Sequence, residues 1–508
     1  MRLVRAWIAA ILFASAPAAA QAPPVAVAPL GEVAFANSGA EAAQAPFLRG
    51  LALLHNFEYD RAAAAFREAE TADPGFAMAW WGEAMTYNHP VWMEQDKEAG
   101  EAVLVHLGAT REARRARAKT PRERGYLEAV ELLYGAGGKE ERDRLYSERM
   151  GALFAAFPDD VDARAFYALS LLGLAHNGRD HVLYMRSAAL LEEVFPSHPR
   201  HPGVVHYLIH SYDDPVHAPL GLRAARVYGA IAPDAGHALH MTSHIYLALG
   251  LWPEVEQANV RAMAVVDAQR AARGKPAGHC GHYQEWLVYA RLQREEDAGP
   301  VVAACRADGL ATLQAVTATG HLDPYRSLTL SWADMAVRRG METGAWALDP
   351  PGPLPEGRYL ETRFTLAYGA LLAAGHDPAR VRAARALLEA LQRPLLEALP
   401  QERPSDMDSA RRVRVVMLQS AGLEKIAAGD AAAGIAALRS AAGAEAAIPA
   451  GFGPPLIEKP SDELLGDALL RLGRFDEAAK AYETALAAAP NRRLSLRGLA
   501  LARQHRPA

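Results

Sequence analysis

Two short stretches near opposite ends of the sequence share one spacing of alanine, aromatic and proline residues. Counted from an aromatic residue at Tyr59 or Phe475, alanine follows at +3 and +10, a second aromatic at +7 and proline at +15. Small residues let two helices cross closely, large residues fill the gap beside them, and proline ends the second helix. The spacing therefore predicts a helix-turn-helix unit of about 34 residues in both places, and a chain assembled by repeating it.

The two windows, residues 47–74 and 465–490, resemble the tetratricopeptide repeat (TPR) family. Weaker copies recur at residues 249–262 and 431–441, prolines interrupt the helical stretches, and no run alternates as a β-strand does. The resemblance implies an all-α, TPR-like, right-handed α-solenoid of helical hairpins with degenerate middle repeats. It also implies a concave groove that binds a protein, a peptide or a small ligand.

The first residues have the pattern of an export signal. A basic start, an apolar stretch over residues 6–16 and three alanines before Gln21 predict a signal peptide at residues 1–20. We expect an exported bacterial-type TPR protein, periplasmic or secreted after cleavage, with no transmembrane segment because no later apolar run reaches about 18 residues. The expected segments are a flexible leader at 21–45, an N-terminal TPR-like array at 46–348, a proline-rich linker at 349–360 and a C-terminal TPR-like array at 361–508.

The overall charge argues against one class of partner. A formal charge of −5 at pH 7 gives no basic surface, so we expect no nucleic-acid binding. The two cysteines, Cys280 and Cys305, are too few for a disulfide framework, and their sequence separation does not reveal whether they form one bridge. The sequence contains no phosphate-binding glycine loop and no nucleophile elbow.

Histidines gather in the middle of the chain. Of the 18 histidines, eight lie within 47 residues, at positions 198, 201, 206, 210, 217, 237, 240 and 244. His206 and His210 are spaced i, i+4, and the set at 237, 240 and 244 is spaced i, i+3, i+7. On helices each set lies along one face, so two faces can share a ligand.

The proline spacing places these two helices side by side. Pro158, Pro196 and Pro233 recur at 38 and 37 residues, and each precedes a helical pattern, at residues 163–173, 204–213 and 237–250. A shift of 38 residues carries His206 onto His244, so both should occupy equivalent positions on neighbouring helices roughly 10 Å apart. We therefore expect the nitrogens of four histidines to converge, with His237 at the edge; the four are His206, His210, His240 and His244.

Converging imidazoles predict a metal site. Neutral imidazole binds zinc and copper, and three or four rings from two rigid helices satisfy a tetrahedral or an open three-histidine site. The candidate ligands are His206, His210, His237, His240 and His244. Residues expected to orient these rings or to add a contact are Asp213, Asp214, His217, His282 and Glu285. The same spacings also suit a polar seam, in which histidines pair with carboxylates or carbonyls between packed helices.

Two classes of function follow. The repeat resemblance gives the broader sequence support, and it favours an exported TPR-repeat solenoid that binds a protein, a peptide or a small ligand in its groove. The alternative is a metalloprotein or metal-dependent enzyme with a multi-histidine site between adjacent repeats. It would be a hydrolase, with Asp213, Asp214 or Glu285 as base, or a copper oxidase. The residues do not decide whether the chain is an enzyme.

Overall fold

The computed structural model describes residues 25–27, 29–319, 328–399 and 404–505, and the expected signal peptide lies outside them. Within these residues the chain is helical, and its strands are two antiparallel pairs of two residues each. One pair is β1 (Val25–Ala26) with β2 (Glu32–Val33), and the other is β3 (Asn88–His89) with β4 (Glu94–Gln95). The prediction of an all-α chain is confirmed.

The helices of the first half are mostly short. They are α1 (Glu41–His55), α2 (Tyr59–Ala72), α3 (Ala77–Met85), the 3-10 turn η1 (Pro90–Trp92), α4 (Lys97–Leu107), α5 (Arg111–Arg117), α6 (Pro121–Leu133), α7 (Lys139–Ala156), α8 (Val161–Leu172), α9 (His181–Glu192), α10 (Pro202–Tyr212), α11 (Ala218–Ile231) and α12 (Gly236–Ala248).

Several helices of the second half are longer. They are α13 (Trp252–Ala272), α14 (His282–Gln293), α15 (Gly299–Thr319), α16 (Leu328–Thr343), α17 (Leu360–Ala373), α18 (Pro378–Ala398), α19 (Pro404–Ala427), α20 (Ala431–Ala446), α21 (Ser461–Arg471), α22 (Phe475–Ala488) and α23 (Arg493–Gln504). Among the helices described, none is long and apolar enough to cross a membrane.

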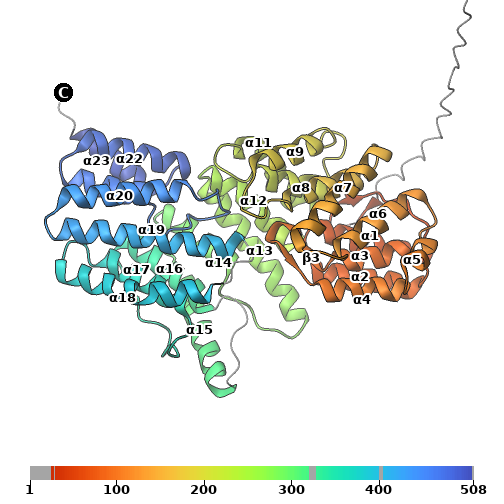
Figure 1. Ribbon diagram of the computed structural model, residues 1–508, viewed down its shortest axis with the longest axis horizontal. Helices are drawn as coiled ribbons and strands as arrows, with labels where there is room; N and C mark the ends of the chain where they lie inside the picture. Colours follow the sequence, from red (N-terminus) through yellow and green to blue (C-terminus); the bar gives the residue numbers. More distant parts are fainter. Residues whose placement is uncertain (1–24, 28, 320–327, 400–403, 506–508) are drawn as a thin grey trace, which may run out of the picture.

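Most helices pack on the helix before and the helix after, which is the contact pattern of a solenoid. Alternate helices also touch, including α8 with α10 and α10 with α12. Figure 1 shows the result as an elongated body, with α1–α7 at one end, α18–α23 at the other, and α12 and α13 between them. The largest apolar core runs from Leu30 to Ala248 and a second one from Phe364 to Ala502.

The three helices expected from the proline spacing are present as α8, α10 and α12. α10 begins where His201 Nδ1 accepts a hydrogen bond from the Val204 amide at 3.3 Å and Pro202 occupies the first turn. Gly203 then passes directly over α1, because a Cβ there would lie 2.3 Å from His55 Nδ1. This close approach draws the histidine-bearing face of α10 onto the end of α1.

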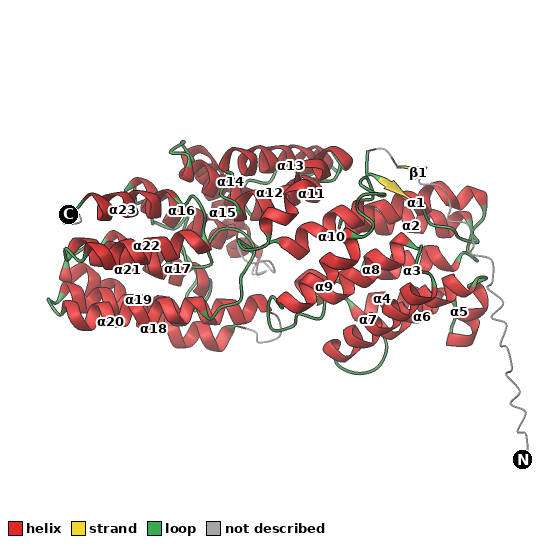
Figure 2. Cartoon of the chain, turned by 90° about the horizontal axis from the view of Figure 1, so that it is seen from above, coloured by secondary structure: helices red, strands yellow, loops and turns green. Residues whose placement is uncertain are grey.

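The C-terminal hairpins reach back to the middle of the chain. Trp252 Nε1 donates to the Asn491 carbonyl at 3.1 Å, and the buried Arg492 donates to Glu463 at 2.7 Å and to the Tyr289 hydroxyl at 3.1 Å. In Figure 2, α21–α23 lie alongside α16 and α17. The proline-rich stretch between α16 and α17 is not helical.

Candidate metal site

Six histidine rings from three helices form one continuous cluster, here called the histidine cluster. Ring centroids of neighbouring members lie 4.6–6.5 Å apart. The members are His206 and His210 on α10, His237, His240 and His244 on α12, and His282 at the start of α14.

The cluster divides into two groups of three. His206, His210 and His237 each offer a nitrogen within 4.8 Å of the others, and so do His240, His244 and His282. His237 therefore lies within the first group, whereas the sequence places it at the edge. His282 lies within the second group, whereas the sequence gives it a supporting role.

Hydrogen bonds on the outer side of three rings fix which nitrogen faces inward. His206 Nδ1 donates to the His55 carbonyl at 2.7 Å, and His244 Nδ1 donates to Asp213 Oδ2 at 2.5 Å. His240 Nδ1 lies 2.7 Å from Asn259 Oδ1, whose amide nitrogen donates to the Val255 carbonyl, so this Nδ1 also carries a hydrogen. A neutral imidazole with its hydrogen on Nδ1 keeps a lone pair on Nε2. This is the arrangement that holds histidine ligands in metal proteins.

Two of these lone pairs face each other. His240 Nε2 and His244 Nε2 lie 3.1 Å apart, and as neutral imidazoles both rings use their hydrogen elsewhere. Two acceptors at this distance repel unless a proton or a metal ion lies between them. Two imidazole nitrogens bound tetrahedrally to one ion at about 2.0–2.1 Å would lie about 3.3 Å apart, close to the observed spacing.

The first group is poor in hydrogen bonds, with His206 and His210 buried and His237 partly buried. Burial lowers the pKa of His206, His210 and His237 well below the usual value, and neighbouring histidines lower it further. His206 Nε2, His237 Nε2 and both ring nitrogens of His210 have no hydrogen-bond partner. Neutral rings with open lone pairs are the form of histidine that binds a metal ion.

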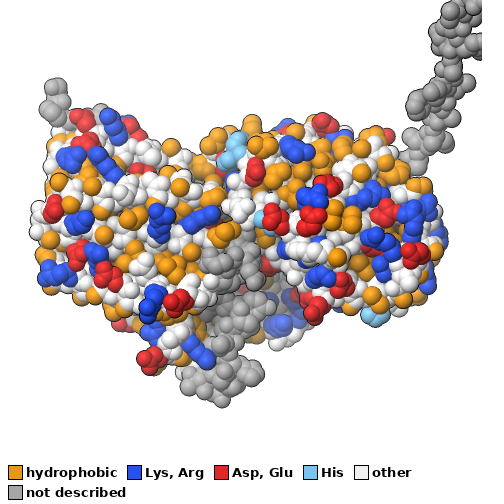
Figure 3. Space-filling model, in the orientation of Figure 1, with side chains coloured by type: hydrophobic (Ala, Val, Ile, Leu, Met, Phe, Trp, Pro, Cys, Tyr) orange, Lys and Arg blue, Asp and Glu red, His pale blue; other side chains and the backbone are white. Residues whose placement is uncertain are grey.

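The second group lies nearer the surface. Burial of the ring lowers the pKa of His240 well below the usual value. His282 is partly exposed to solvent, and desolvation together with the neighbouring His244 lowers its pKa to about 3. Figure 3 shows only small areas of histidine on the face that it presents. Four of the six rings are buried, His237 is partly buried and His282 is the most accessible member.

Aromatic side chains surround the cluster. Phe57 lies 4.3 Å from the ring of His206, and Trp286 lies 4.5 Å from the ring of His244, centroid to centroid. Phe452, from the loop between α20 and α21, contacts His210 and His244 at 6.2 and 5.9 Å. These rings exclude water, which strengthens electrostatic interactions inside the site.

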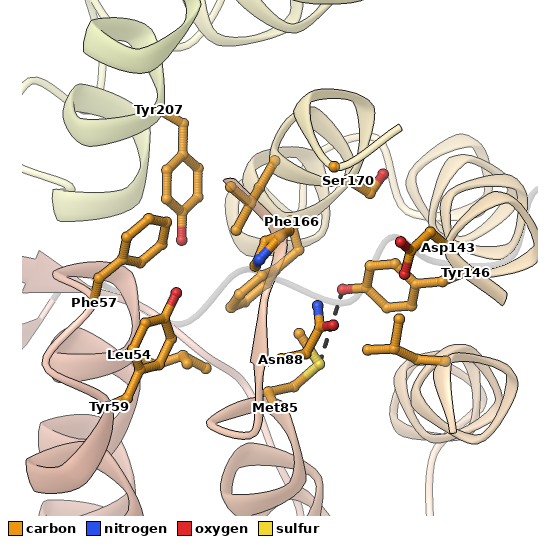
Figure 4. A pocket seen from close by; sticks show the side chains of 14 residues that line it. Leu54, Phe57, Tyr59, Met85, Asn88, Asp143, Tyr146, Phe166, Ser170 and Tyr207 are labelled. Atoms are coloured by element: carbon orange, nitrogen blue, oxygen red, sulfur yellow. Dashed lines mark hydrogen bonds between the residues drawn. The ribbon is translucent and has the colours of Figure 1, made fainter. Parts of the chain in front are cut away.

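A small cavity adjoins the aromatic wall. Its volume is about 20 Å³, room for roughly one water molecule, and Phe57 and Tyr207 line one side of it. Figure 4 shows the hydroxyl of Tyr146 pointing to the sulfur of Met85 across this space. The cavity is too small to hold a substrate beside the histidines.

The carboxylates expected near the cluster have distinct surroundings. Asp213 orients His244, as described above. Asp214 lies beneath the start of α11, where it accepts hydrogen bonds from His217 Nδ1 at 2.8 Å and from two backbone amides. Glu285 acts electrostatically on Asp334, whose pKa is raised well above the usual value mainly by burial.

His55 and Asp162 belong to a neighbouring network that the sequence pattern does not reveal. Asp162 Oδ1 accepts from His55 Nε2 at 2.9 Å and from His201 Nε2 at 3.2 Å, while His55 Nδ1 bonds the Tyr207 hydroxyl at 2.9 Å. Both rings use both nitrogens in hydrogen bonds, since His201 Nδ1 caps α10. This network joins α1, α8 and α10. The backbone carbonyl of His55 accepts the hydrogen bond from His206 Nδ1 and so positions that ring.

Comparison with known proteins identifies the repeat. Residues 463–492 match the family model of the tetratricopeptide repeat, and they cover α21, α22 and the turn that follows. No curated protein matches the chain.

Among solved structures, similarity is found to the APC/C hetero-tetramer Cut9–Hcn1, with 12% identity over 92% of this chain and 78% of that chain at a TM-score of 0.38. The TPR domain of P58(IPK) matches with 10% identity over 91% and 98% at a TM-score of 0.22. Naa15/Naa10 bound to HypK-THB matches with 10% identity over 87% and 62% at a TM-score of 0.24. The helical packing and the family match together make this chain an all-α, TPR-like solenoid with a tetratricopeptide repeat at residues 463–492.

Proposed function

We propose that this protein is a metal-binding α-solenoid that holds two transition-metal ions, one in each group of the histidine cluster. The observation that carries the proposal is the pair of Nε2 lone pairs of His240 and His244, which face each other at 3.1 Å. The unpartnered nitrogens of His206, His210 and His237 support the same assignment for the first group. A hydrogen-bonded polar seam would pair these atoms with donors instead.

The number of ligands favours chemistry or ion transfer over a purely structural role. Structural zinc sites have four protein ligands, whereas three-histidine sites keep one coordination position open. Each group of the cluster offers three histidines. When bound, the ions would supply a redox or Lewis-acid centre at the open position, and the protein residues hold and orient the ligand rings.

Copper is the metal that we expect to bind more tightly. Zinc and copper both accept imidazole ligands, but Cu²⁺ ranks above Zn²⁺ for a given nitrogen site. The hydrolytic version of the proposal requires a carboxylate as base, but Asp213 and Asp214 already accept hydrogen bonds from His244 and His217. The third expected base, Glu285, acts on the buried Asp334. The redox version is therefore the one that the described contacts favour.

The test is metal analysis of the purified chain. After loading with copper or zinc and removal of excess metal, the wild type should retain two equivalents. The double variant His206→Ala, His210→Ala should retain one, and so should His240→Ala, His244→Ala. The control His106→Ala removes an exposed histidine of α4 and should retain two. Wild-type protein that retains less than one equivalent, with normal helicity by circular dichroism, refutes the proposal.

Export of the chain is part of the proposal. The signal-like pattern at residues 1–20 supports it, and so does the disulfide between Cys280 and Cys305, because disulfides persist in oxidising compartments. Fractionation of cells that produce the full chain should place it in the periplasm or the medium, with an N-terminus near Gln21. A chain that stays in the cytoplasm with its first residues intact contradicts export.

Binding of a protein or peptide in the groove is a second candidate function, because the repeat at residues 463–492 has the form of a TPR unit. Tyr482 packs against Gly466 and Gly498 and thereby holds α21, α22 and α23 together. Binding of a partner that the repeat recognises should be lost in the variant Tyr482→Ala and kept in the double variant His206→Ala, His244→Ala. Loss in the histidine variant alone would assign that partner to the metal site.

A further inference from the structure

A buried arginine beside the histidine cluster has no hydrogen-bond partner for its two terminal nitrogens. Arg179 lies in the loop between α8 and α9, and only 1% of its side chain is exposed. Its Nε donates to the Ala450 carbonyl at 3.3 Å, but neither terminal nitrogen makes a hydrogen bond. Burying a guanidinium with unmet donors is costly, so such a group points to an acceptor that a ligand supplies.

The nearest carboxylate does not fill this role. Asp214 Oδ2 is 3.6 Å from an Arg179 terminal nitrogen, which is beyond a normal hydrogen bond. The same oxygen already accepts from His217 Nδ1 at 2.8 Å. Asp214 therefore offsets part of the charge of Arg179 and leaves its donors unmatched. Tyr184 and Phe452 stack on the guanidinium, at 4.6 and 5.1 Å from its carbon to the ring centroids, and supply no acceptor.

Phe452 connects the arginine with the metal site. Its ring contacts Arg179, His210 and His244, so it fills the space between the guanidinium and the histidine cluster. The ring belongs to the non-helical stretch between α20 and α21. A ligand that reaches both Arg179 and the cluster must therefore take the place of this ring.

We propose that Arg179 binds the carboxylate of a small ligand in the space that the Phe452 ring now fills, next to the histidine cluster. The fork of two terminal nitrogens matches the two oxygens of a carboxylate in a planar, bidentate pairing. Because the Arg179 Nε also holds the Ala450 carbonyl, the carboxylate and the loop contact the same side chain. Ligand binding and displacement of the loop are thereby coupled.

A carboxylate is thus the ligand class that we assign to the proposed metal site. The assignment rests on the proposed function only for the metal ion beside the carboxylate. The pairing with Arg179 itself needs no metal. Binding is therefore measured on metal-free protein, by calorimetry, with benzoate as the probe and benzamide as its uncharged match. Wild type should bind benzoate at least tenfold more tightly than benzamide.

Four variants separate the carboxylate site from a general effect on folding. Arg179→Met should lose at least tenfold in benzoate affinity, and Arg179→Lys, which keeps the charge without the fork, should also bind more weakly than wild type. Phe452→Ala removes the competing ring and should bind benzoate more tightly than wild type. Arg186→Met, a control at an exposed arginine of α9, should bind as wild type does.

Three results overturn the inference. The first is equal benzoate binding by Arg179→Met and wild type, and the second is no benzoate binding by Phe452→Ala. The third is tighter binding of inorganic phosphate than of benzoate, which would assign Arg179 to another anion class. Metal content is measured in parallel on loaded protein. Carboxylate binding without metal retention would leave the inference standing while the proposed metal function fails.

Discussion

Asp213 Oδ2 accepts a hydrogen bond from His244 Nδ1 at 2.5 Å, and this pair joins the end of α10 to α12 across their interface. The carboxylate holds the ring in the tautomer that presents Nε2 to the cluster, and its negative charge makes that nitrogen a stronger donor to a metal. Asp213→Asn should therefore lower the metal affinity of the second group by about 10–100-fold. Competition with a chromophoric chelator measures this change.

A matched control for Asp213 lies elsewhere in the chain. Asp308 bonds His279 Nδ1 at 3.2 Å, on a half-exposed pair outside the cluster. Asp308→Asn should leave the metal affinity at the wild-type value. Equal affinity of both variants would show that Asp213 does not act through His244.

The network beneath the cluster should matter for stability. Asp162 is fully buried and accepts from both His55 and His201. Both bonds reach the same oxygen, Oδ1, so an asparagine can still accept them but lacks the negative charge that strengthens them. Asp162→Asn should therefore lower the free energy of unfolding by about 1–3 kcal/mol. Thermal unfolding measures the loss. Asp234→Asn removes a half-exposed partner of Arg61 and should change stability by less than about 1 kcal/mol.

The fold was predictable where the sequence keeps a fixed spacing. The spacing of alanine and aromatic residues that begins at Phe475 coincides with α22. The recurrence of Pro158, Pro196 and Pro233 located α8, α10 and α12. Both patterns report helix length and turn position, which local residue types determine. The return of the loop between α20 and α21 onto the cluster was not predictable, because contacts such as Phe452 with His210 depend on the path of the whole solenoid.

The candidate site was predictable only within neighbouring repeats. His206 and His244 are one period apart, so the repeat places them together. His282 follows His240 by 42 residues, because α13 is 21 residues long and a non-helical segment follows it, and this breaks the period. Arg179 and the carbonyl of His55 carried no signal in the sequence, since one lies in a loop and the other is a backbone atom.

The disulfide between Cys280 and Cys305 should stabilise the region around His282. It closes a loop of 25 residues, for which the chain-entropy model gives about 3.5 kcal/mol. We expect the variant Cys280→Ser, Cys305→Ser to unfold at a lower temperature than the oxidised wild type. Titration with a thiol reagent under denaturing conditions should find no free thiol in the wild type. An unchanged unfolding temperature would contradict the stabilising role.

A buried carboxylate outside the site gives a pH-dependent prediction. Burial and the neighbouring Glu83 raise the pKa of Glu70 to about 9. The unfolded chain ionises this group near pH 4.5 and the folded chain only near pH 9, so Glu70 costs stability progressively as pH rises between these values. Glu70→Gln should therefore unfold at a higher temperature than wild type at pH 8 and at the same temperature at pH 4. Glu68→Gln, an exposed control, should show no such difference.

Gly453 should be needed to keep the loop closed over the cluster. Its φ of +90° disfavours any residue with a Cβ, and a Cβ there would lie 2.6 Å from Trp286. Gly453→Ala should therefore push the loop away from Trp286, carry Phe452 off His244, and raise amide hydrogen exchange over residues 448–456. Gly429→Ala is the control for backbone strain alone, because Gly429 has a φ of +92° with nothing near its Cβ position. If both variants leave exchange in this loop unchanged, the packing of Gly453 on Trp286 is not what holds Phe452 against the histidines.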